Sequence, residues 1–318
     1  MAPMRIAVFG AGGVGGYFGA RLAQAGESVV FIARGAHLDA IRREGLRVES
    51  PLGFVTLRPT VATDEPAAVG AVDAVLMCVK AWQLGDAAKS LRPLLGTDTY
   101  VLPLQNGVEA ADQLAAALGR ERVLGGLCRI VSYVSGPGRI RHAGLEPRIE
   151  FGERDRPRSA RVEALQRAFE MTIGVSVGTP EDIEAAIWAK FLFIAPFSGV
   201  GAVVRRPAGP LREVPETRRM LEEAMVEVGR LAQARGVALR ADAVAESMKF
   251  VDGLPEDATA SMQRDILDGR PSELEHLSGA VVRLGREAGV PVPVNACLYA
   301  SLLPAELEAR RRKPRGGR

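Results

Sequence analysis

"RIAVFGAGGVGGYFGARLAQAG", residues 5–26, joins an apolar run to a glycine-rich turn and then to an amphipathic segment. The run 5–10 has the character of a buried strand. The segment 15–26 has helical periodicity and ends on a glycine, a common helix stop. A first strand that passes through glycines straight into a helix is typical of the doubly wound α/β fold.

The turn itself contains the spacing Gly10-x-Gly12-x-x-Gly15. Gly10 permits a tight turn, Gly12 lets the backbone approach a pyrophosphate, and Gly15 allows the helix to pack closely on the strand. Gly13 and Val14 lie at the helix start, whose backbone N–H groups suit an anion. We therefore expect all five residues to bind a dinucleotide cofactor. A glycine turn that serves packing alone is the alternative.

Strand-like and helix-like segments alternate through the first half of the chain, which predicts an α/β protein with a Rossmann-like, largely parallel sheet. From Pro180 onward helical periodicity replaces the strand signals. We expect a nucleotide-binding domain over 1–179, an all-helical domain over 180–309 and a basic, disordered tail over 310–318. The further strands expected in the first domain are 28–34, 46–59 (a hairpin), 72–80, 99–107, 122–134, 138–153 and 174–180.

Composition and charge exclude several classes of protein. The 318 residues are 47% hydrophobic and 25% charged, as in an ordinary soluble globular protein. The net charge is +3, and the tail 310–318 holds six of the 41 basic residues, so the rest of the chain carries a slight excess of acid. This distribution does not support a basic face for nucleic acid.

The three cysteines, Cys78, Cys128 and Cys297, are widely spaced and odd in number. None lies at metal-ligand spacing from a histidine, so we expect no zinc site. Reduced thiols and the lack of a signal-peptide pattern at the start favour a cytoplasmic protein.

The most apolar stretch, "IWAKFLFIAPFSGVGAVV" at 187–204, carries a single charge at Lys190. A membrane span needs about 20 apolar residues. The run after Lys190 is shorter, is interrupted by Pro196 and two glycines, and is closed by two arginines. We therefore expect no membrane span here.

The residue after the second strand sets the cofactor preference. An NAD site usually places an acid there, to bond the ribose 2′-hydroxyl, whereas this chain has Arg34 and no acid before Asp39. A guanidinium suits a 2′-phosphate, so we expect NADP(H). Lys80 ends another strand and is a candidate second cation. The alternatives are that Arg34 is a surface arginine on a loop and that Lys80 is an exposed lysine closing its strand, neither with a role in binding.

"LQNG" at 104–107 ends a further strand, and strand ends in such sheets face the ligand. The amide of Asn106 both donates and accepts hydrogen bonds, which suits a residue between cofactor and substrate. A plain Asn–Gly turn is the alternative.

These landmarks resemble the 2-dehydropantoate 2-reductase (ketopantoate reductase) family over nearly the whole chain. The resemblance implies a Rossmann domain with a helical domain like the C-terminal domain of 6-phosphogluconate dehydrogenase. It also implies reduction of a 2-oxo acid by NADPH, by default of 2-dehydropantoate to pantoate in pantothenate biosynthesis. The matching stretches are "GAGGVGGYFGARLAQAG", "IARGAHLDAIRREGL", "CVKAWQ", "LQNGVE", "IWAK", "SMQRDILDGRPSELEHLSG" and "GVPVPVN".

The resemblance implies that Lys190 is the general acid and that Ser261 contacts the substrate. It further implies that Glu273 is a second catalytic residue that helps to anchor cofactor or substrate, and that Asn106 bridges the two. Reduction of a carbonyl leaves negative charge on oxygen, which a nearby ammonium stabilises and protonates. Each residue also has a structural alternative. The stem of Lys190 could cover apolar neighbours, Ser261 could cap a helix, and Glu273 could be an ordinary acid in the first turn of a helix.

Four positions depart from the family pattern, which usually has asparagine there. Ile194 and Ser198 follow Lys190 at four-residue spacing, which places them on its helix face and in the expected substrate site. Ala208 and Ser278 replace two further amides. Loss of these amides favours a less polar or differently shaped 2-oxo acid than ketopantoate as the alternative substrate. A non-catalytic NADP(H)-binding protein is a third interpretation, and a homodimer is compatible with the helical domain.

Overall fold

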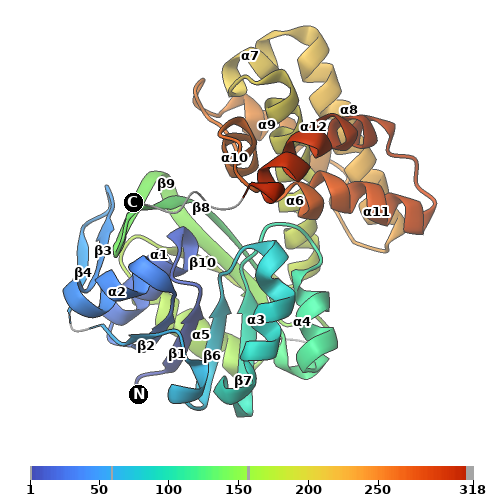
Figure 1. The fold of residues 1–318 in the computed structure, drawn as a ribbon. Helices are drawn as coiled ribbons and strands as arrows, with labels where there is room; N and C mark the ends of the chain where they lie inside the picture. Colours follow the sequence, from blue (N-terminus) through green and yellow to red (C-terminus); the bar gives the residue numbers. More distant parts are fainter. Residues whose placement is uncertain (1, 59, 156–157, 313–318) are drawn as a thin grey trace. The chain divides into compact units, whose positions relative to one another are not determined.

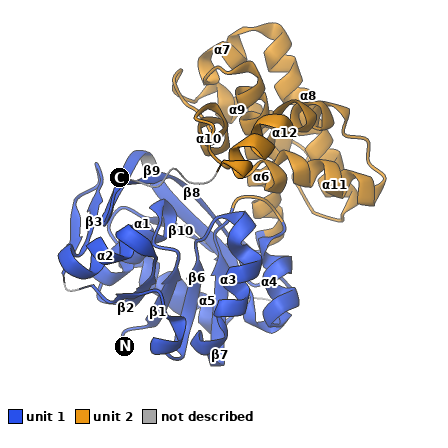
Figure 2. Ribbon diagram, in the orientation of Figure 1, with its two compact units in different colours: residues 1–105, 109–183 blue, residues 106–108, 184–318 orange. Residues whose placement is uncertain are grey.

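The computed structural model describes residues 2–58, 60–155 and 158–312. The chain forms two compact units (Figure 2). Residues 1–105 and 109–183 make up unit 1, and residues 106–108 and 184–318 make up unit 2.

Unit 1 contains a five-stranded parallel sheet with the strand order β5-β2-β1-β6-β7 (Figure 1). Its strands are β1 (Arg5–Phe9), β2 (Ser28–Ile32), β5 (Ala62–Thr63), β6 (Val72–Met77) and β7 (Leu95–Pro103). The connecting helices are α1 (Gly13–Gln24), α2 (Gly35–Glu44), α3 (Leu84–Ser90) and α4 (Ala110–Leu118). This arrangement confirms the expected Rossmann-like domain.

Side chains of β1 alternate between two apolar cores. Ile6 and Val8 belong to a core with Phe18 of α1, whereas Ala7 and Phe9 belong to a core with Leu84 of α3. Both faces of the strand are therefore buried, which is why β1 is apolar throughout rather than alternating.

The remaining strands of unit 1 form a second, mixed sheet. Its order is β10-β9-β3-β4, and β8 pairs with β9. The strands are β3 (Leu46–Glu49), β4 (Val55–Leu57), β8 (Gly125–Gly136), β9 (Arg139–Gly152) and β10 (Ser176–Gly178). The sequence led us to add the strands expected at 138–153 and 174–180 to the end of the first sheet, which is wrong, because β9 and β10 belong to this second sheet. The hairpin expected at 46–59 is confirmed by the antiparallel pairing of β3 with β4. A two-residue turn joins β8 to β9, and so short a connection forces antiparallel pairing instead of a parallel crossover.

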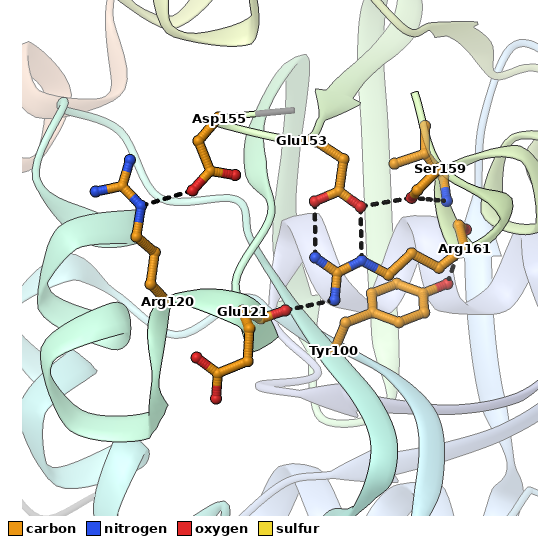
Figure 3. Close-up of polar contacts among 8 residues, drawn as sticks. Tyr100, Arg120, Glu121, Glu153, Asp155, Ser159 and Arg161 are labelled. Carbon is orange, nitrogen blue, oxygen red and sulfur yellow. Dashed lines mark hydrogen bonds and ion pairs between the residues drawn. The ribbon is translucent and has the colours of Figure 1, made fainter. Parts of the chain in front are cut away.

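An ion pair fastens α5 (Ala160–Glu170) to the end of β9 (Figure 3). Arg161 donates from Nε and Nη2 to the buried carboxylate of Glu153, at 2.7 Å each, and its guanidinium lies 5.6 Å from the ring of Tyr100. The Ser159 hydroxyl donates to the same carboxylate and caps α5 by accepting from the Val162 N–H. These contacts are structural supports of unit 1.

Unit 2 consists of helices around one apolar core. They are α6 (Ile183–Val204), α7 (Ala208–Glu213), α8 (Pro215–Ala234), α9 (Ala243–Asp252), α10 (Ser261–Leu267), the 3₁₀ turn η5 (Leu274–His276), α11 (Ser278–Ala288) and α12 (Pro293–Arg311). Helix α6 supplies buried residues along most of its length. The expected all-helical architecture of this part of the chain is confirmed.

Helix α6 differs from its expected form. We expected Pro196 and the glycines to interrupt the apolar run, yet the helix is continuous for 22 residues with Pro196 inside it. By length and composition alone it would suffice to cross a membrane, but 67% of its apolar window is buried within the protein. Burial among α8, α10 and α11 residues stabilises the helix despite the proline, so it is a core helix.

Helix α12 extends further than expected. Helix α12 continues through Arg311, because Arg310 pairs at 2.7 Å with the buried Glu306 one turn earlier and donates to the Ser272 carbonyl. Assigning residues 310 and 311 to a disordered tail is therefore wrong. The stretch 313–318 lies outside the described residues.

Candidate active site

The three glycines of the turn after β1 have different surroundings. Gly10 has φ +103°, and a Cβ there would lie 3.0 Å from the backbone of Cys78 and Val79. A Cβ on Gly15 would lie 2.1 Å from the Gly10 carbonyl oxygen, so only glycine lets α1 pack this closely on the turn. At Gly12, by contrast, no atom of the described residues lies within 4 Å of the Cβ position. The backbone is open at that point.

The start of α1 offers backbone donors. Gly12 is the N-cap residue and supplies no side-chain cap, and the first turn carries no acid. The first N–H groups of a helix have no partner within the helix, so the turn fits an anion such as a cofactor pyrophosphate. On its other side, a Cβ on Gly13 would lie 2.4 Å from the Ser132 carbonyl oxygen of β8, so Gly13 serves packing.

Two residues beside this turn, His37 and Ser132, were missed by sequence reasoning. His37 lies 2.8 Å from the Ala11 carbonyl oxygen through Nε2, and its Nδ1 accepts the Gly138 N–H at 3.1 Å. The imidazole thus ties the turn to α2 and to the β8–β9 hairpin. Ser132 has a buried hydroxyl without a hydrogen-bond partner among the described residues. Neither residue lies at a spacing that would have predicted a role.

The two candidate phosphate ligands follow the two strands that flank β1. Arg34 is exposed, follows β2 by two residues and is the N-cap of α2. Lys80 is exposed, follows β6 by three residues, and its Nζ lies 5.6 Å from the Trp82 ring. Because β2 and β6 flank β1 in parallel, both cations and the glycine turn follow carboxyl ends at one edge of the sheet.

In unit 2, the structure joins three of the predicted residues into one hydrogen-bonded chain. Lys190 of α6 donates from Nζ to Asn106 Oδ1 at 2.8 Å. Asn106 in turn donates from Nδ2 to Glu273 Oε2 at 2.9 Å. The amide therefore separates an ammonium from a carboxylate and bonds both, with its oxygen toward the cation and its nitrogen toward the anion.

The local structure explains how Lys190 and Asn106 are held. Trp188 and Phe191, the neighbours of Lys190, are buried and meet edge to face at 5.6 Å. The Nζ of the half-buried Lys190 is bonded to Asn106. This contact disfavours the alternative in which the lysine stem only covers apolar neighbours while Nζ reaches solvent. Gly107 has φ +99°, and a Cβ there would lie 2.7 Å from the His276 carbonyl oxygen, so the Asn–Gly pair also allows a close approach.

The other predicted substrate residues are placed as follows. Ser261 is half-buried at the start of α10 and makes no capping bond, so the helix-cap alternative is not supported. Ile194 is half-buried and packs against the core of unit 2. Ser198 and Ser278 are fully buried, and neither hydroxyl has a hydrogen-bond partner among the described residues. Ala208 is buried, with its N–H bonded to the Ala258 carbonyl.

Other reactive groups do not form a site of their own. Burial raises the pKa of the Cys78 thiol well above its usual value, and the nearby Cys128 raises it further, so the thiol stays protonated. Within the described ranges, no cluster of three or more His, Cys, Asp or Glu residues could hold a metal ion.

Comparison with known proteins identifies the family. The profile of ketopantoate reductase PanE/ApbA matches residues 6–156, and that of its C-terminal part matches residues 182–306. The chain belongs to the ketopantoate reductase PanE/ApbA family. It is therefore an oxidoreductase.

Individual members of the family cover almost the whole chain. An uncharacterised oxidoreductase of Bacillus subtilis, YkpB, is 32% identical over 96% of this chain and 100% of its own length. The 2-dehydropantoate 2-reductase of Halobacterium salinarum is 34% identical over 92% of this chain and 95% of its own. The crystal structure of a family member from Ralstonia eutropha superposes with a TM-score of 0.87 at 33% identity, covering 97% of this chain and 100% of that one.

Proposed function

We propose that this oxidoreductase reduces a 2-oxo acid to a 2-hydroxy acid with NADPH, and that 2-dehydropantoate is its default substrate. The observation that carries the proposal is the hydrogen-bonded chain of Lys190, Asn106 and Glu273. It supports the role of general acid for Lys190, because an ammonium held by an amide is fixed in place to stabilise and protonate an oxyanion.

The mechanism divides the work between groups of this chain. A reduced nicotinamide, when bound, would supply the hydride for the carbonyl carbon. Lys190 donates its proton to the oxygen on which charge develops, and Asn106 keeps Nζ oriented for that transfer. Glu273 fixes the Asn106 amide and anchors cofactor or substrate, while Ser261 contacts the substrate. The open backbone at Gly12 and the start of α1 would hold the pyrophosphate.

The preference for NADPH rests on Arg34 and Lys80. Both are exposed cations at the sheet edge that also carries the glycine turn. A guanidinium there bonds a 2′-phosphate with two donors, whereas an NAD site would need an acceptor for the ribose hydroxyl.

A second candidate substrate is a less polar 2-oxo acid, which Ile194 favours. This residue is one turn after Lys190 and therefore on the same face of α6, where it presents hydrocarbon instead of an amide. Ser198, the next residue on that face, is fully buried and has a shorter polar side chain than asparagine.

A panel assay separates the two. Purified protein is given NADPH with ketopantoate and with 2-oxo acids that carry unsubstituted alkyl or aryl groups, and oxidation of the cofactor is followed. The proposal expects turnover of ketopantoate. Turnover of an apolar oxo acid alone selects the second candidate, and NADPH binding without turnover of any of them overturns both.

A further inference from the structure

The segment that carries Glu273 is held by one face of helix α12. Tyr299, Glu306 and Arg310 lie seven and four residues apart, which places them along a single side of the helix. Tyr299 donates from its hydroxyl to Glu275 Oε1 at 2.7 Å, and the other two side chains bind Ser272. Glu273 therefore stands between two residues that α12 fixes.

Glu306 makes the central contacts of this attachment. It is 1% exposed and occupies a position in the buried stripe of α12, between Leu302 and Ala309, where an apolar residue is the usual choice. Its two oxygens accept the Ser272 N–H at 3.1 and 3.0 Å, and Oε2 also accepts the Ser272 hydroxyl at 2.5 Å. Arg310 pairs with Oε1 at 2.7 Å.

These bonds leave Ser272 little freedom. Arg310 also binds the Ser272 carbonyl at 2.9 Å, so the N–H, the carbonyl and the hydroxyl of one residue are all bound by α12. The hydroxyl additionally accepts the Leu274 N–H at 3.2 Å, across Glu273. A carboxylate is costly to bury and is retained only where its bonds are made, so the network fixes the backbone on both sides of Glu273.

The position of Glu273 in turn decides which way the Asn106 amide faces. An amide can rotate by half a turn, which exchanges its acceptor oxygen and its donor nitrogen. With Glu273 Oε2 as acceptor for Nδ2, the oxygen faces Lys190. Without that acceptor, the amide is free to turn a donor toward the ammonium, and the lysine loses its bond.

We propose that Glu306 is a positioning residue for the reaction, acting through Ser272 and Glu273 on the Asn106–Lys190 pair. An effect of Glu306 on turnover can be interpreted only if the function proposed above is correct. An effect of Glu306 on the geometry of Lys190 can be measured without substrate, so the two proposals can be tested separately.

The first test is a set of substitutions with steady-state kinetics on the purified full chain. Glu306→Gln keeps the volume of the side chain but removes its charge and one acceptor. We expect kcat to fall by about ten- to a hundredfold, because misplacement of a catalytic group by about 1 Å has an effect of that size. KM should change less than kcat, because the Asn106–Lys190 pair acts on the oxygen that gains charge in the transition state.

The matched control lies two residues further along the same helix. Glu308 also pairs with an arginine at i+4, Arg312, but both side chains are exposed, 65% and 66% respectively. Glu308→Gln removes the same charge from the same helix and should leave kcat unchanged. Ser272→Ala deletes the hydroxyl's bonds to Glu306 and to the Leu274 N–H but keeps the backbone contacts, and it serves if Glu306→Gln does not fold.

A double variant separates positioning from general stability. If Glu306 acts through Glu273, adding Glu306→Gln to Glu273→Ala lowers kcat no further than Glu273→Ala alone. Losses that multiply, or a lower melting temperature for Glu306→Gln with unchanged kcat, would overturn the inference while the proposed function stands.

An NMR measurement without substrate decides the inference even if the proposed function fails. The chain has five lysines, at positions 80, 89, 190, 249 and 313, so isotope-labelled lysine gives few side-chain signals, and Lys190→Ala assigns the relevant one. Glu306→Gln and Glu273→Ala should both change the pH titration of the Lys190 signal, and Glu308→Gln should not. A Lys190 signal indifferent to Glu306→Gln refutes the positioning role. Absence of any oxo acid reduction by the wild-type protein refutes only the proposed function.

Discussion

The two units prepare their functional groups in different ways. The turn of unit 1 is made of backbone: at Gly12 the chain is open, and the donors of α1 carry no side-chain cap. The chain of Lys190, Asn106 and Glu273 in unit 2 is made of side chains that already bond one another. The backbone site offers N–H groups that the helix itself does not use, so a ligand can bind them directly. The side-chain site depends on hydrogen bonds between its own residues, which keep them in position.

The largest effect should come from breaking the side-chain site. Lys190→Ala removes the ammonium that protonates the developing oxyanion, so we expect kcat to fall by about a hundred- to ten-thousandfold. Cofactor binding, which we assign to unit 1, should stay unchanged when measured by titration of NADPH fluorescence. Lys249→Ala, at an exposed lysine in the same unit, is the control. A variant at position 190 with near-normal kcat would leave unit 2 without its assigned acid.

Substitutions at two glycines of unit 1 should distinguish a role in packing from a role in ligand binding. Gly15→Ala places a Cβ 2.1 Å from the Gly10 carbonyl oxygen and should destabilise the protein by about 1–3 kcal/mol, as overpacking does. Gly12→Ala meets no described atom within 4 Å, so its melting temperature should match that of the wild type. Its affinity for NADPH should nevertheless fall, because the new methyl group occupies the space of the pyrophosphate. Unchanged NADPH affinity in Gly12→Ala would show that the opening does not serve the cofactor.

An effect of similar size should show which nicotinamide cofactor unit 1 prefers. If Arg34 bonds the 2′-phosphate, Arg34→Ala should weaken NADPH binding by about 1.5–3 kcal/mol, the range for hydrogen bonds to charged groups. NADH lacks that phosphate and should bind almost as before. Arg43→Ala, at an exposed arginine of the same helix, should affect neither cofactor. Equal losses for both cofactors in Arg34→Ala would contradict the assignment.

The smallest effect concerns the helix that supports the side-chain site. Burial, and then the bond to Glu275, raises the pKa of Tyr299 from 10.0 to about 12. The folded state thus favours the neutral phenol, and this contribution to stability is complete below pH 10 and is lost as the pH rises through 12. Tyr299→Phe should lower stability near neutral pH by about 0.5–1.5 kcal/mol, the usual value of one hydrogen bond. It should also flatten the alkaline decline measured by urea unfolding at several pH values.

Unit 1 offers a comparison for that measurement. Burial also raises the pKa of Tyr100 in β7, so Tyr100→Phe should flatten the alkaline decline in the same direction. If only Tyr100→Phe does so, the bond between Tyr299 and Glu275 is not formed in solution.

The sequence predicts the backbone site better than the side-chain site, for a physical reason. The glycine spacing between β1 and α1 is local, so residues 5–26 alone imply the turn and the first helix. Asn106 and Glu273 are 167 residues apart and meet only through tertiary folding. Their roles, like that of Lys190, were expected from resemblance to a family, and the hydrogen bonds that join the three were not predicted.

The role of Glu306 could not be predicted from the sequence. Its pairing with Arg310 at i,i+4 has the same pattern as the exposed pair of Glu308 and Arg312, and only burial distinguishes the two. Likewise, Pro196 reads as a helix breaker in sequence, whereas packing in unit 2 keeps α6 continuous. Burial is a property of the whole fold, so these features could not be predicted from local pattern.

The most direct test of the account is chemical rescue of Lys190→Ala by small primary amines. The central claim is that an ammonium at this position protonates the substrate oxygen. Methylammonium added to the variant, with NADPH and oxo acid saturating, should raise the rate in proportion to its concentration, and more bulky amines should do so less. A variant that binds both ligands yet shows no amine-dependent rate would contradict the claim.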